Sequence, residues 1–301
     1  MTAFTVEETA SLEIRQPGLL AEMYTLSPFV WREDQSYGLL LRVVNRSDIP
    51  AEKVSRIYYG TSRDGLAFTV GDQPVIAPGP GADDRDGCED PTLATVQGVT
   101  YVYYSGWNQT SERGKLLLAA GINAEHLEKR GVAIPYTSEQ ENPKEASILQ
   151  ASDGSWRLFY EYSHGGASRV GLASAPAVDG PWTVRGSPFQ ARPGHWDDWH
   201  LSPGPVLRSA RNRHVMFYNG GTRDAHWRIG WIEFDEQCLQ VTDRGDEPLI
   251  IPPPGEPGDT DIAFVASAVQ QGKDIFLYYS VADKDLIRAT IRRSESARQP
   301  R

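Results

Sequence analysis

The chain has 301 residues, of which 40% are hydrophobic and 10% aromatic, enough to bury a sizeable core. Its 40 acidic residues outnumber the 30 basic ones and give a formal net charge of −10. Nucleic acids and anionic membranes are bound by basic surfaces, so we expect neither as a partner.

The sequence shows no sign of membrane insertion or secretion. No apolar run approaches the roughly 20 residues of a membrane helix. Residues 1–8 have neither the basic nor the apolar region of a secretory signal. Cys88 and Cys238 do not form the pattern of a disulfide framework. We therefore expect a soluble, cytoplasmic protein.

Short β-branched and aromatic runs, separated by turn residues that include many of the 28 glycines and 21 prolines, predict an all-β fold. The stretch with the most helical character, residues 122–130, is short and equally compatible with a loop. Five strand-like runs recur about every 60 residues, near the upper range of propeller blade periods: 38–44, 101–106, 156–162, 214–220 and 274–280.

Each of these runs has a strand-like neighbour on both sides. The stretches that follow are 56–60, 115–119, 169–173, 228–232 and 286–290. The stretches that precede, each opened by a polar cluster, are 26–30, 89–93, 144–148, 202–206 and 259–264. Turn signals at 64–68 and 179–182 lead into a fourth, outer strand. We predict a five-bladed β-propeller forming one domain over residues 1–301, with irregular segments at about 1–22 and 293–301.

Acidic residues stand at one end of the predicted inner strands. Inner strands of a propeller surround a central channel, so residues at the same end of each strand converge. We therefore expect a ring of carboxylates at this end: Glu89, Asp90, Glu145, Asp198, and Asp259 or Asp261. For most of the aromatic residues we expect packing between blades instead.

The segment Gly87-Cys88-Glu89-Asp90-Pro91 resembles the Gly-x-Glu-Asp-Pro signature of glycoside hydrolase family 130. That family contains mannoside phosphorylases and β-mannosidases on a five-bladed propeller. Residues 39–43, 62–68, 144–146 and 258–269 resemble further family segments in the same order, so the resemblance spans roughly residues 24–291. Related furanosidase propellers also contain Glu-Asp-Pro, and the joint order of the segments is the stronger argument. The resemblance implies that Asp90 is the proton donor and that Ser27, Arg42 and Asp259, with Asp261 as the alternative, hold the sugar.

The sequence departs from the phosphorylases of this family where they gather phosphate. Glu161 stands in place of an Arg, Asn219 in place of a His, and Thr92 in place of the Arg that usually follows Glu-Asp-Pro, while Lys144 is kept. A carboxylate in place of a guanidinium repels phosphate. These departures favour hydrolysis over phosphorolysis.

Hydrolysis of a glycosidic bond needs one protonated and one ionised carboxyl group. Burial and the neighbouring Glu89 are expected to raise the pKa of Asp90, which suits a general acid. Glu161 lies where a phosphorylase would hold its phosphate, so we predict that Glu161 is the general base and that the reaction inverts the anomeric configuration. Structural interpretations stay open for three acids: turn bonding for Glu89, a surface position for Glu161, and ion pairing or tuning of the acid's pKa for Glu145.

Residues 195–200, His-Trp-Asp-Asp-Trp-His, form the densest polar and aromatic cluster. The spacing of its two histidines does not favour a metal site, and we expect no metal and no cofactor. Trp196 and Trp199 are interpreted as stacking platforms for sugar rings, or alternatively as packing residues. Polar side chains of this cluster and of other strand ends complete the predicted substrate-binding set, whose members are Ser27, Arg42, Glu89, Asn108, Lys144, Glu145, His164, Asp198, His200, Asn219, Asp259 and Asp261.

The sequence therefore predicts a glycoside hydrolase acting on a β-linked, manno-configured or similar short oligosaccharide. One alternative is a mannoside phosphorylase that binds inorganic phosphate through Lys144, Arg63 or Arg228. Two others are a carbohydrate-binding propeller without catalysis and a related furanosidase.

Overall fold

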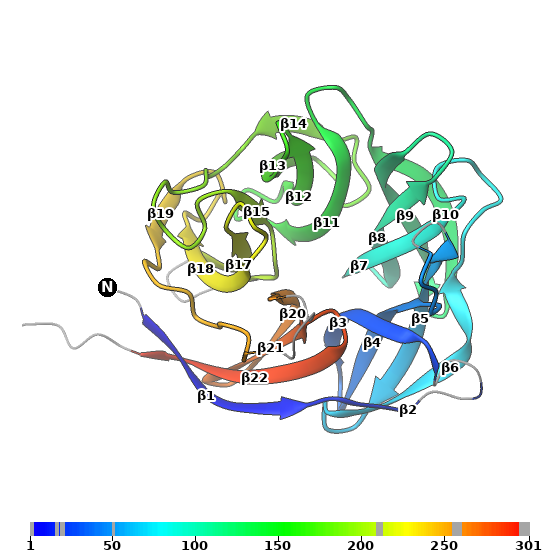
Figure 1. Ribbon diagram of the computed structural model, residues 1–301, viewed down its shortest axis with the longest axis horizontal. Helices are drawn as coiled ribbons and strands as arrows, with labels where there is room; N and C mark the ends of the chain where they lie inside the picture. The colour runs from blue at the N-terminus through cyan, green and yellow to red at the C-terminus, as the bar shows by residue number, and fades with distance from the viewer. Residues whose placement is uncertain are drawn as a thin grey trace, which may run out of the picture.

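The computed structural model describes residues 3–15, 18, 22–49, 52–208, 213–254 and 261–294. These residues form five sheets, or blades, arranged in a ring, and within each blade the strands β3 to β22 pair antiparallel (Figure 1). The predicted five-bladed β-propeller is confirmed. Among the described residues, no helix is long and apolar enough to cross a membrane.

The blades follow one another in chain order, and the innermost strand of each comes first. Blade 1 contains β3 (Tyr24–Glu33), β4 (Ser36–Val44), β5 (Ser55–Ser62) and β6 (Ala67–Ile76). Blade 2 contains β7 (Gly87–Val96), β8 (Val99–Asn108), β9 (Arg113–Asn123) and β10 (His126–Ile134). Blade 3 contains β11 (Glu141–Gln150), β12 (Trp156–His164), β13 (Ala167–Ala175) and β14 (Thr183–Gly186).

The inner strand of blade 4 is divided in two. Residues 203–205 read Pro-Gly-Pro, and proline has no N–H to give to a ladder. Blade 4 contains β15 (His200–Ser202), β16 (Val206–Arg208), β17 (His214–Gly221), β18 (Trp227–Phe234) and β19 (Val241–Arg244). Blade 5 contains β20 (Ala263–Gln271), β21 (Asp274–Val281) and β22 (Asp285–Ser294).

The start of the chain is not irregular, contrary to the prediction for residues 1–22. β1 (Ala3–Ser11) pairs with β22 and forms the outer strand of blade 5, and β2 (Glu13–Arg15) runs parallel to β6 of blade 1 (Figure 1). The N-terminal segment therefore joins the last blade to the first. At the other end, β22 extends to Ser294, and the rest of the predicted irregular segment lies outside the described residues.

Residues 122–130 contain no helix and form the hairpin between β9 and β10. The side-chain oxygen of Asn123 accepts hydrogen bonds from the backbone N–H groups of Glu125 and His126. An Asx-type turn thus reverses the chain here. Of the two structures that the sequence allowed for this stretch, helix and loop, the loop is the one observed.

The core lies between neighbouring blades. Leu40 and Ile57 of blade 1, for example, share one buried cluster with Val102 and Leu117 of blade 2. Each of the other buried clusters among the described residues likewise joins adjacent blades. The aromatic residues of the strands serve mainly this packing, which leaves the polar strand ends to form a site.

Phe4 anchors the N-terminal strand to this core. Its ring contacts those of Phe217 and Trp231, with centroids 5.2 and 5.4 Å apart. Phe4→Ala is expected to lower the free energy of unfolding by about 3 kcal/mol, because it leaves a cavity where three rings met. Chemical denaturation measures this, with the exposed Val6 of the same strand, changed to Ala, as the control. Equal losses in both variants would contradict an anchoring role for Phe4.

Candidate active site

The inner strands share a distortion at the same level of the propeller. The pairing of the inner strand with the second strand shifts register after Leu26, Glu89, Lys144 and Val265 in blades 1, 2, 3 and 5. In the first three blades the next residue, Ser27, Asp90 or Glu145, has a left-handed backbone, with φ of 47°, 49° and 49°. A β-bulge redirects a side chain, and here the bulges redirect a hydroxyl and two carboxyl groups.

The second strand of each blade carries a matching position beside this distortion. In blades 2, 4 and 5 it is occupied by Ser105, Asn219 and Ser280, which accept hydrogen bonds from backbone N–H groups of the next blade's inner strand. In blades 1 and 3 the same position holds the charged residues Arg42 and Glu161. The same repeat position that links neighbouring blades therefore also places the Arg42 guanidinium and the Glu161 carboxylate at this level of the propeller.

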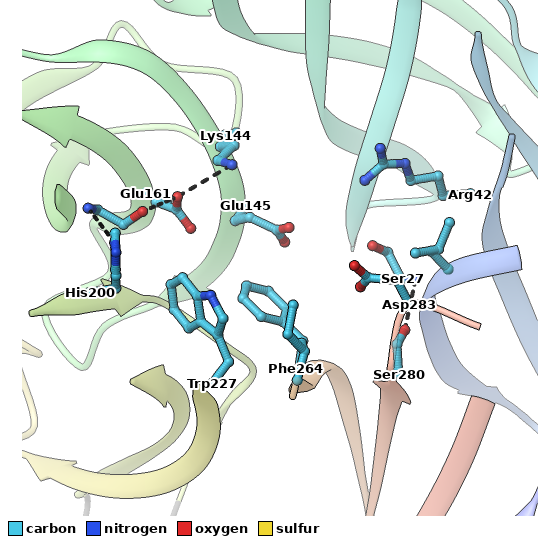
Figure 2. Close-up of a pocket in the computed structure, with 13 residues that line it drawn as sticks. Ser27, Arg42, Lys144, Glu145, Glu161, His200, Trp227, Phe264, Ser280 and Asp283 are labelled. Carbon is cyan, nitrogen blue, oxygen red and sulfur yellow. Dashed lines mark hydrogen bonds and ion pairs between the residues drawn. The ribbon is translucent and has the colours of Figure 1, made fainter. Parts of the chain in front are cut away.

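A cavity of about 220 Å³ opens at this end of the propeller. Figure 2 shows Lys144, Glu161 and His200 on one side, Arg42, Ser27 and Asp283 on the other, and the Glu145 carboxyl group pointing between them. The full lining comprises Leu26, Ser27, Arg42, Lys144, Glu145, Glu161, Ser168, His200, Trp227, Ile262, Phe264, Ser280 and Asp283.

Asp90 lies behind this lining, held by Arg42 and Ser27. It is 4% exposed; Arg42 Nη1 stands 3.0 Å from its Oδ1, and the Ser27 hydroxyl donates to the same oxygen at 2.7 Å. Burial opposes ionisation of Asp90, but Arg42, Ser27 and Lys144 outweigh it and hold the pKa below its usual value. The predicted rise in the pKa of Asp90 is therefore wrong, because the neighbouring blade supplies a cation.

Glu145 has the opposite electrostatic character. Burial, followed by the negative charges of Asp90 and Glu161, raises the pKa of Glu145 well above its usual value. Its side chain is hydrogen-bonded to Asp90. The two carboxyl groups thus form a coupled pair, in which Glu145 carries the proton and Asp90 the charge. Two roles were left open for Glu145, ion pairing and tuning of the pKa of Asp90. Its hydrogen bond to Asp90 favours the second.

The raised pKa of Glu145 has a consequence for stability. The folded protein keeps this group protonated over a pH range in which the unfolded chain ionises it, so folding stability falls as pH rises above the ordinary value of 4.5. Glu145→Gln removes this pH-dependent loss of stability. The difference in Tm, variant minus wild type, should therefore increase between pH 5 and pH 8. Thermal unfolding measures the difference, with Glu141→Gln in the same strand as the control. A difference that does not change with pH would contradict the assignment.

Glu161 is 2% exposed, so its interpretation as a surface acid is wrong. The Ser168 hydroxyl donates to Glu161 Oε1 at 2.7 Å, and Lys144 Nζ lies 3.4 Å from the same atom. Glu161 is the main cause of a raised pKa of Lys144, which keeps the ammonium group charged. His200 Nδ1 accepts the Ser168 N–H at 3.1 Å, and burial lowers the pKa of His200, which favours the neutral ring.

Glu89 stands beside this cavity. Its carboxylate lies 2.9 Å from Arg42 and accepts a hydrogen bond from the Ser55 hydroxyl at 2.8 Å. The partners of Glu89 are therefore side chains, in place of the backbone amides of a turn that the structural interpretation expected. Glu89 lines an adjacent cavity, of which Lys144 is also a part.

Besides Glu89, five predicted binding residues within the described ranges do not line this cavity. The Asn108 amide donates to Ala82 O and accepts the Ser111 N–H of its own turn. Asn219 is fully buried, with its amide bonded to the backbone of residues 203 and 265. These local and blade-to-blade bonds are invisible in a strand pattern. The other three are His164, Asp198 and Asp261.

Asp261 is absent from the lining, and its carboxylate is held by Arg228 and His226. Arg228 Nη2 and His226 Nδ1 each lie 2.7 Å from its Oδ2. The alternative residue, Asp259, lies outside the described residues. Of the three cations considered as phosphate ligands, Arg228 is already paired with Asp261. Arg63 follows β5 at the end of the blade opposite to Arg42, so it lies away from the cavity.

The aromatic cluster at 195–200 contributes less than expected. Trp196 stacks on Tyr218, with ring centroids 5.5 Å apart, so packing is its observed role. Trp199 lies against the guanidinium groups of Arg169 and Arg223. Within the described ranges, no group of three or more His, Cys, Asp or Glu side chains is placed to hold a metal ion.

Sequence reasoning missed several residues of the lining, among them Ser168, Trp227, Phe264, Ser280 and Asp283. Ser280 had a usable signal, because it occupies the same repeat position as Arg42 and Glu161. Asp283 lies in a turn after the last of the five recurring runs, 274–280, where the local pattern indicates nothing beyond a chain reversal.

A propeller whose mouth joins coupled carboxyl groups to apolar and aromatic side chains has the features of a glycoside-active enzyme. The family model described as β-1,4-mannooligosaccharide phosphorylase, that of glycoside hydrolase family 130, matches residues 33–295. The chain belongs to this family.

Individual relatives are distant. The 1,2-β-oligomannan phosphorylase of Thermoanaerobacter sp. (strain X514) is 23% identical over 236 residues, which cover 76% of each chain. The structure of the Listeria innocua β-1,2-mannobiose phosphorylase with β-1,2-mannobiose has a TM-score of 0.76 at 18% identity, covering 95% of this chain and 91% of that one. A structure reported with family members that are hydrolases of β-1,2 mannosidic linkages in Candida mannan has a TM-score of 0.74 at 22% identity, covering 89% and 84%.

Proposed function

We propose that the chain is an inverting glycoside hydrolase that acts on β-linked, manno-configured oligosaccharides. The named relatives act on β-1,2-linked mannosides, which makes β-1,2-mannobiose the first substrate to test.

The observation that carries the proposal is the buried carboxylate of Glu161 on the wall of the cavity. Both cations of the lining are already paired, Arg42 with Asp90 and Glu89, and Lys144 with Glu161. A phosphate dianion bound beside Lys144 would lie against Glu161. Two like unit charges about 4 Å apart repel by about 4 kcal/mol at an effective dielectric constant of about 20. Water carries no such penalty.

In the proposed reaction, Glu161 takes a proton from a water molecule whose oxygen bonds to the anomeric carbon. The bond between that carbon and the glycosidic oxygen breaks, and the leaving oxygen receives the proton shared by Asp90 and Glu145. Attack opposite to the departing group inverts the anomeric configuration. Lys144 pairs with the base, and Arg42 keeps the charge of the acidic pair on Asp90.

Phosphorolysis is the second candidate, because Lys144 lines the cavity and the named relatives are phosphorylases. Product analysis separates the two. Incubation with β-1,2-mannobiose in phosphate-free buffer is expected to release mannose, at a rate that added phosphate does not raise. Formation of mannose 1-phosphate that depends on added phosphate would overturn the proposal. Sugar binding without any turnover would instead support a non-catalytic carbohydrate-binding propeller.

A further inference from the structure

Ser168 lies in β13, close to the proposed base Glu161. Glu161 pairs with Val170 across the β12–β13 hairpin, so Ser168 is its diagonal neighbour on the same face of the sheet. The register is set by a two-residue turn, Gly165-Gly166, in which both residues have a left-handed backbone, with φ of 60° and 74°. The hairpin thereby brings the Ser168 hydroxyl within hydrogen-bond reach of the Glu161 carboxylate.

The Ser168 hydroxyl makes the two oxygens of Glu161 unequal. It donates to Oε1 at 2.7 Å, and Lys144 Nζ lies 3.4 Å from the same atom. In the described part of the chain, Oε2 has no hydrogen-bond or ion-pair partner, and it is not among the side-chain atoms that are both unpartnered and shut off from solvent. Because Glu161 lines the cavity, Oε2 is the oxygen left to take a proton from a molecule bound there.

The backbone N–H of Ser168 determines which nitrogen of His200 carries the proton. A backbone N–H can only donate, so Nδ1, which accepts it at 3.1 Å, has no proton. The neutral ring therefore carries its proton on Nε2, where it is a donor. Trp227 packs against this ring, with centroids 5.4 Å apart, and restrains its plane. Within the described ranges, Nε2 has no hydrogen-bond partner.

A water molecule fits between these two open atoms. Figure 2 shows Glu161 and His200 on the same side of the cavity, and both residues line it. Oε2 can only accept a hydrogen bond and Nε2–H can only donate one, so a single water molecule can donate to the first and accept from the second. Its remaining lone pair is then free to attack, in an orientation that the protein sets.

We propose that Ser168 is a positioning residue, which holds Glu161 and His200 so that the attacking water is bound between Glu161 Oε2 and the Nε2–H group of His200. This inference rests on the proposed function. The water oxygen bonds to the anomeric carbon and gives one proton to Oε2. The bond to the glycosidic oxygen breaks, and that oxygen takes the proton shared by Asp90 and Glu145. His200 keeps its own proton and acts only as a donor.

The first test is the tautomer of His200, measured by NMR on the full chain without substrate. The protonated and unprotonated nitrogens of a neutral imidazole have well-separated ¹⁵N shifts, which a long-range ¹H–¹⁵N correlation spectrum at about pH 8 distinguishes. His200→Gln assigns the signal by its loss. A proton on Nε2 is expected in wild type and also in Ser168→Ala, which keeps the backbone N–H. A proton on Nδ1 would overturn the inference.

The second test is steady-state kinetics with β-1,2-mannobiose. Ser168→Ala removes the hydroxyl group and should lower kcat by about 10- to 100-fold, the equivalent of one hydrogen bond to a charged acceptor, with little change in KM. Ser168→Thr keeps a hydroxyl group and should recover most of kcat. Ser174→Ala in the same strand is the control and should match wild type, because the Ser174 hydroxyl bonds to Arg185 and does not line the cavity. Wild-type kcat in Ser168→Ala, or equal losses in the Ala and Thr variants, would contradict the positioning role.

A third comparison isolates the donor role of His200. His200→Gln puts an amide N–H close to the position of Nε2–H and should keep most of kcat. His200→Ala has no donor and should lose about 10-fold in kcat, the equivalent of one hydrogen bond between neutral groups. Equal losses in the two variants would show that His200 does not donate to the water.

These measurements separate the inference from the proposed function. A proton on Nδ1 of His200 in a chain that hydrolyses β-1,2-mannobiose overturns the inference alone. Release of mannose 1-phosphate in place of mannose overturns the proposed function and the water site with it. In that case a proton on Nε2 would still show that Ser168 orients the ring.

Discussion

Glu161→Gln is expected to lower kcat on β-1,2-mannobiose by about 10²- to 10⁴-fold, the usual contribution of a positioned general base. The amide keeps the size of the side chain and its contact with Ser168 but cannot take a proton from water. KM should change little, because Lys144 and the opposite wall remain. Reducing-sugar release over a range of substrate concentrations measures both parameters.

Glu141→Gln is a suitable control, since Glu141 lies in the same blade but contacts Tyr136 and does not line the cavity. A second variant, Glu161→Ala, tests the geometry. Azide added to this variant should attack the anomeric carbon in place of water and yield the mannosyl azide of inverted configuration, with the leaving oxygen protonated as before. Turnover of Glu161→Gln within a few-fold of wild type would show that the base lies elsewhere.

The second large effect concerns the Asp90–Glu145 pair. Asp90→Asn should reduce turnover of β-1,2-mannobiose by about 10²- to 10⁴-fold, because a sugar alkoxide leaves only when it is protonated. A dinitrophenyl β-mannoside, whose leaving group needs no proton, should lose much less. Comparing kcat/KM for the two substrates measures the effect. Equal losses on both substrates would indicate that Asp90 binds or positions the sugar and does not contribute to acid catalysis.

The pH profile of the same pair gives an independent check. Wild-type activity requires the shared proton and should fall as pH rises through the apparent pKa of the coupled pair. In Glu145→Gln the remaining acid, Asp90, still faces Arg42 and the Ser27 hydroxyl, which lower its pKa. The descending limb should therefore move to lower pH. An unchanged alkaline limb would mean that Glu145 does not hold the catalytic proton.

The five-bladed ring could be predicted from sequence because each blade repeats its own local pattern, and inner strands meet at the centre whatever their sequence. The repeat also placed Glu145 at the end where the cavity opens, whereas Ser27, Arg42, Lys144 and Glu161 were assigned from the resemblance to the family. β1 could not be recognised in this way. Its partner in β22 lies more than 270 residues further along, and its mostly exposed side chains give no strong alternation.

Electrostatic details were less accessible than topology. The pKa of Asp90 depends on Arg42, which reaches it from the neighbouring blade, and the sequence indicates only that Glu89 is adjacent. The orientation of Asp261 depends on Arg228, 33 residues earlier. Asp283 entered the cavity unforeseen for the same reason. Such contacts are set by how blades pack, and a single sequence does not encode them in any local pattern.

The pairing of β1 with β22 constrains how the molecule can assemble. The strand β1 is synthesised long before its hydrogen-bonding partner β22, so blade 5 cannot be finished until β22 has emerged from the ribosome. Contacts this far apart in sequence slow folding, because the entropy of closing so long a loop is lost before any pairing compensates for it. Until then the outer edge of β22 remains an open template for any other strand, and fidelity of folding depends on how quickly the N-terminal strand reaches it.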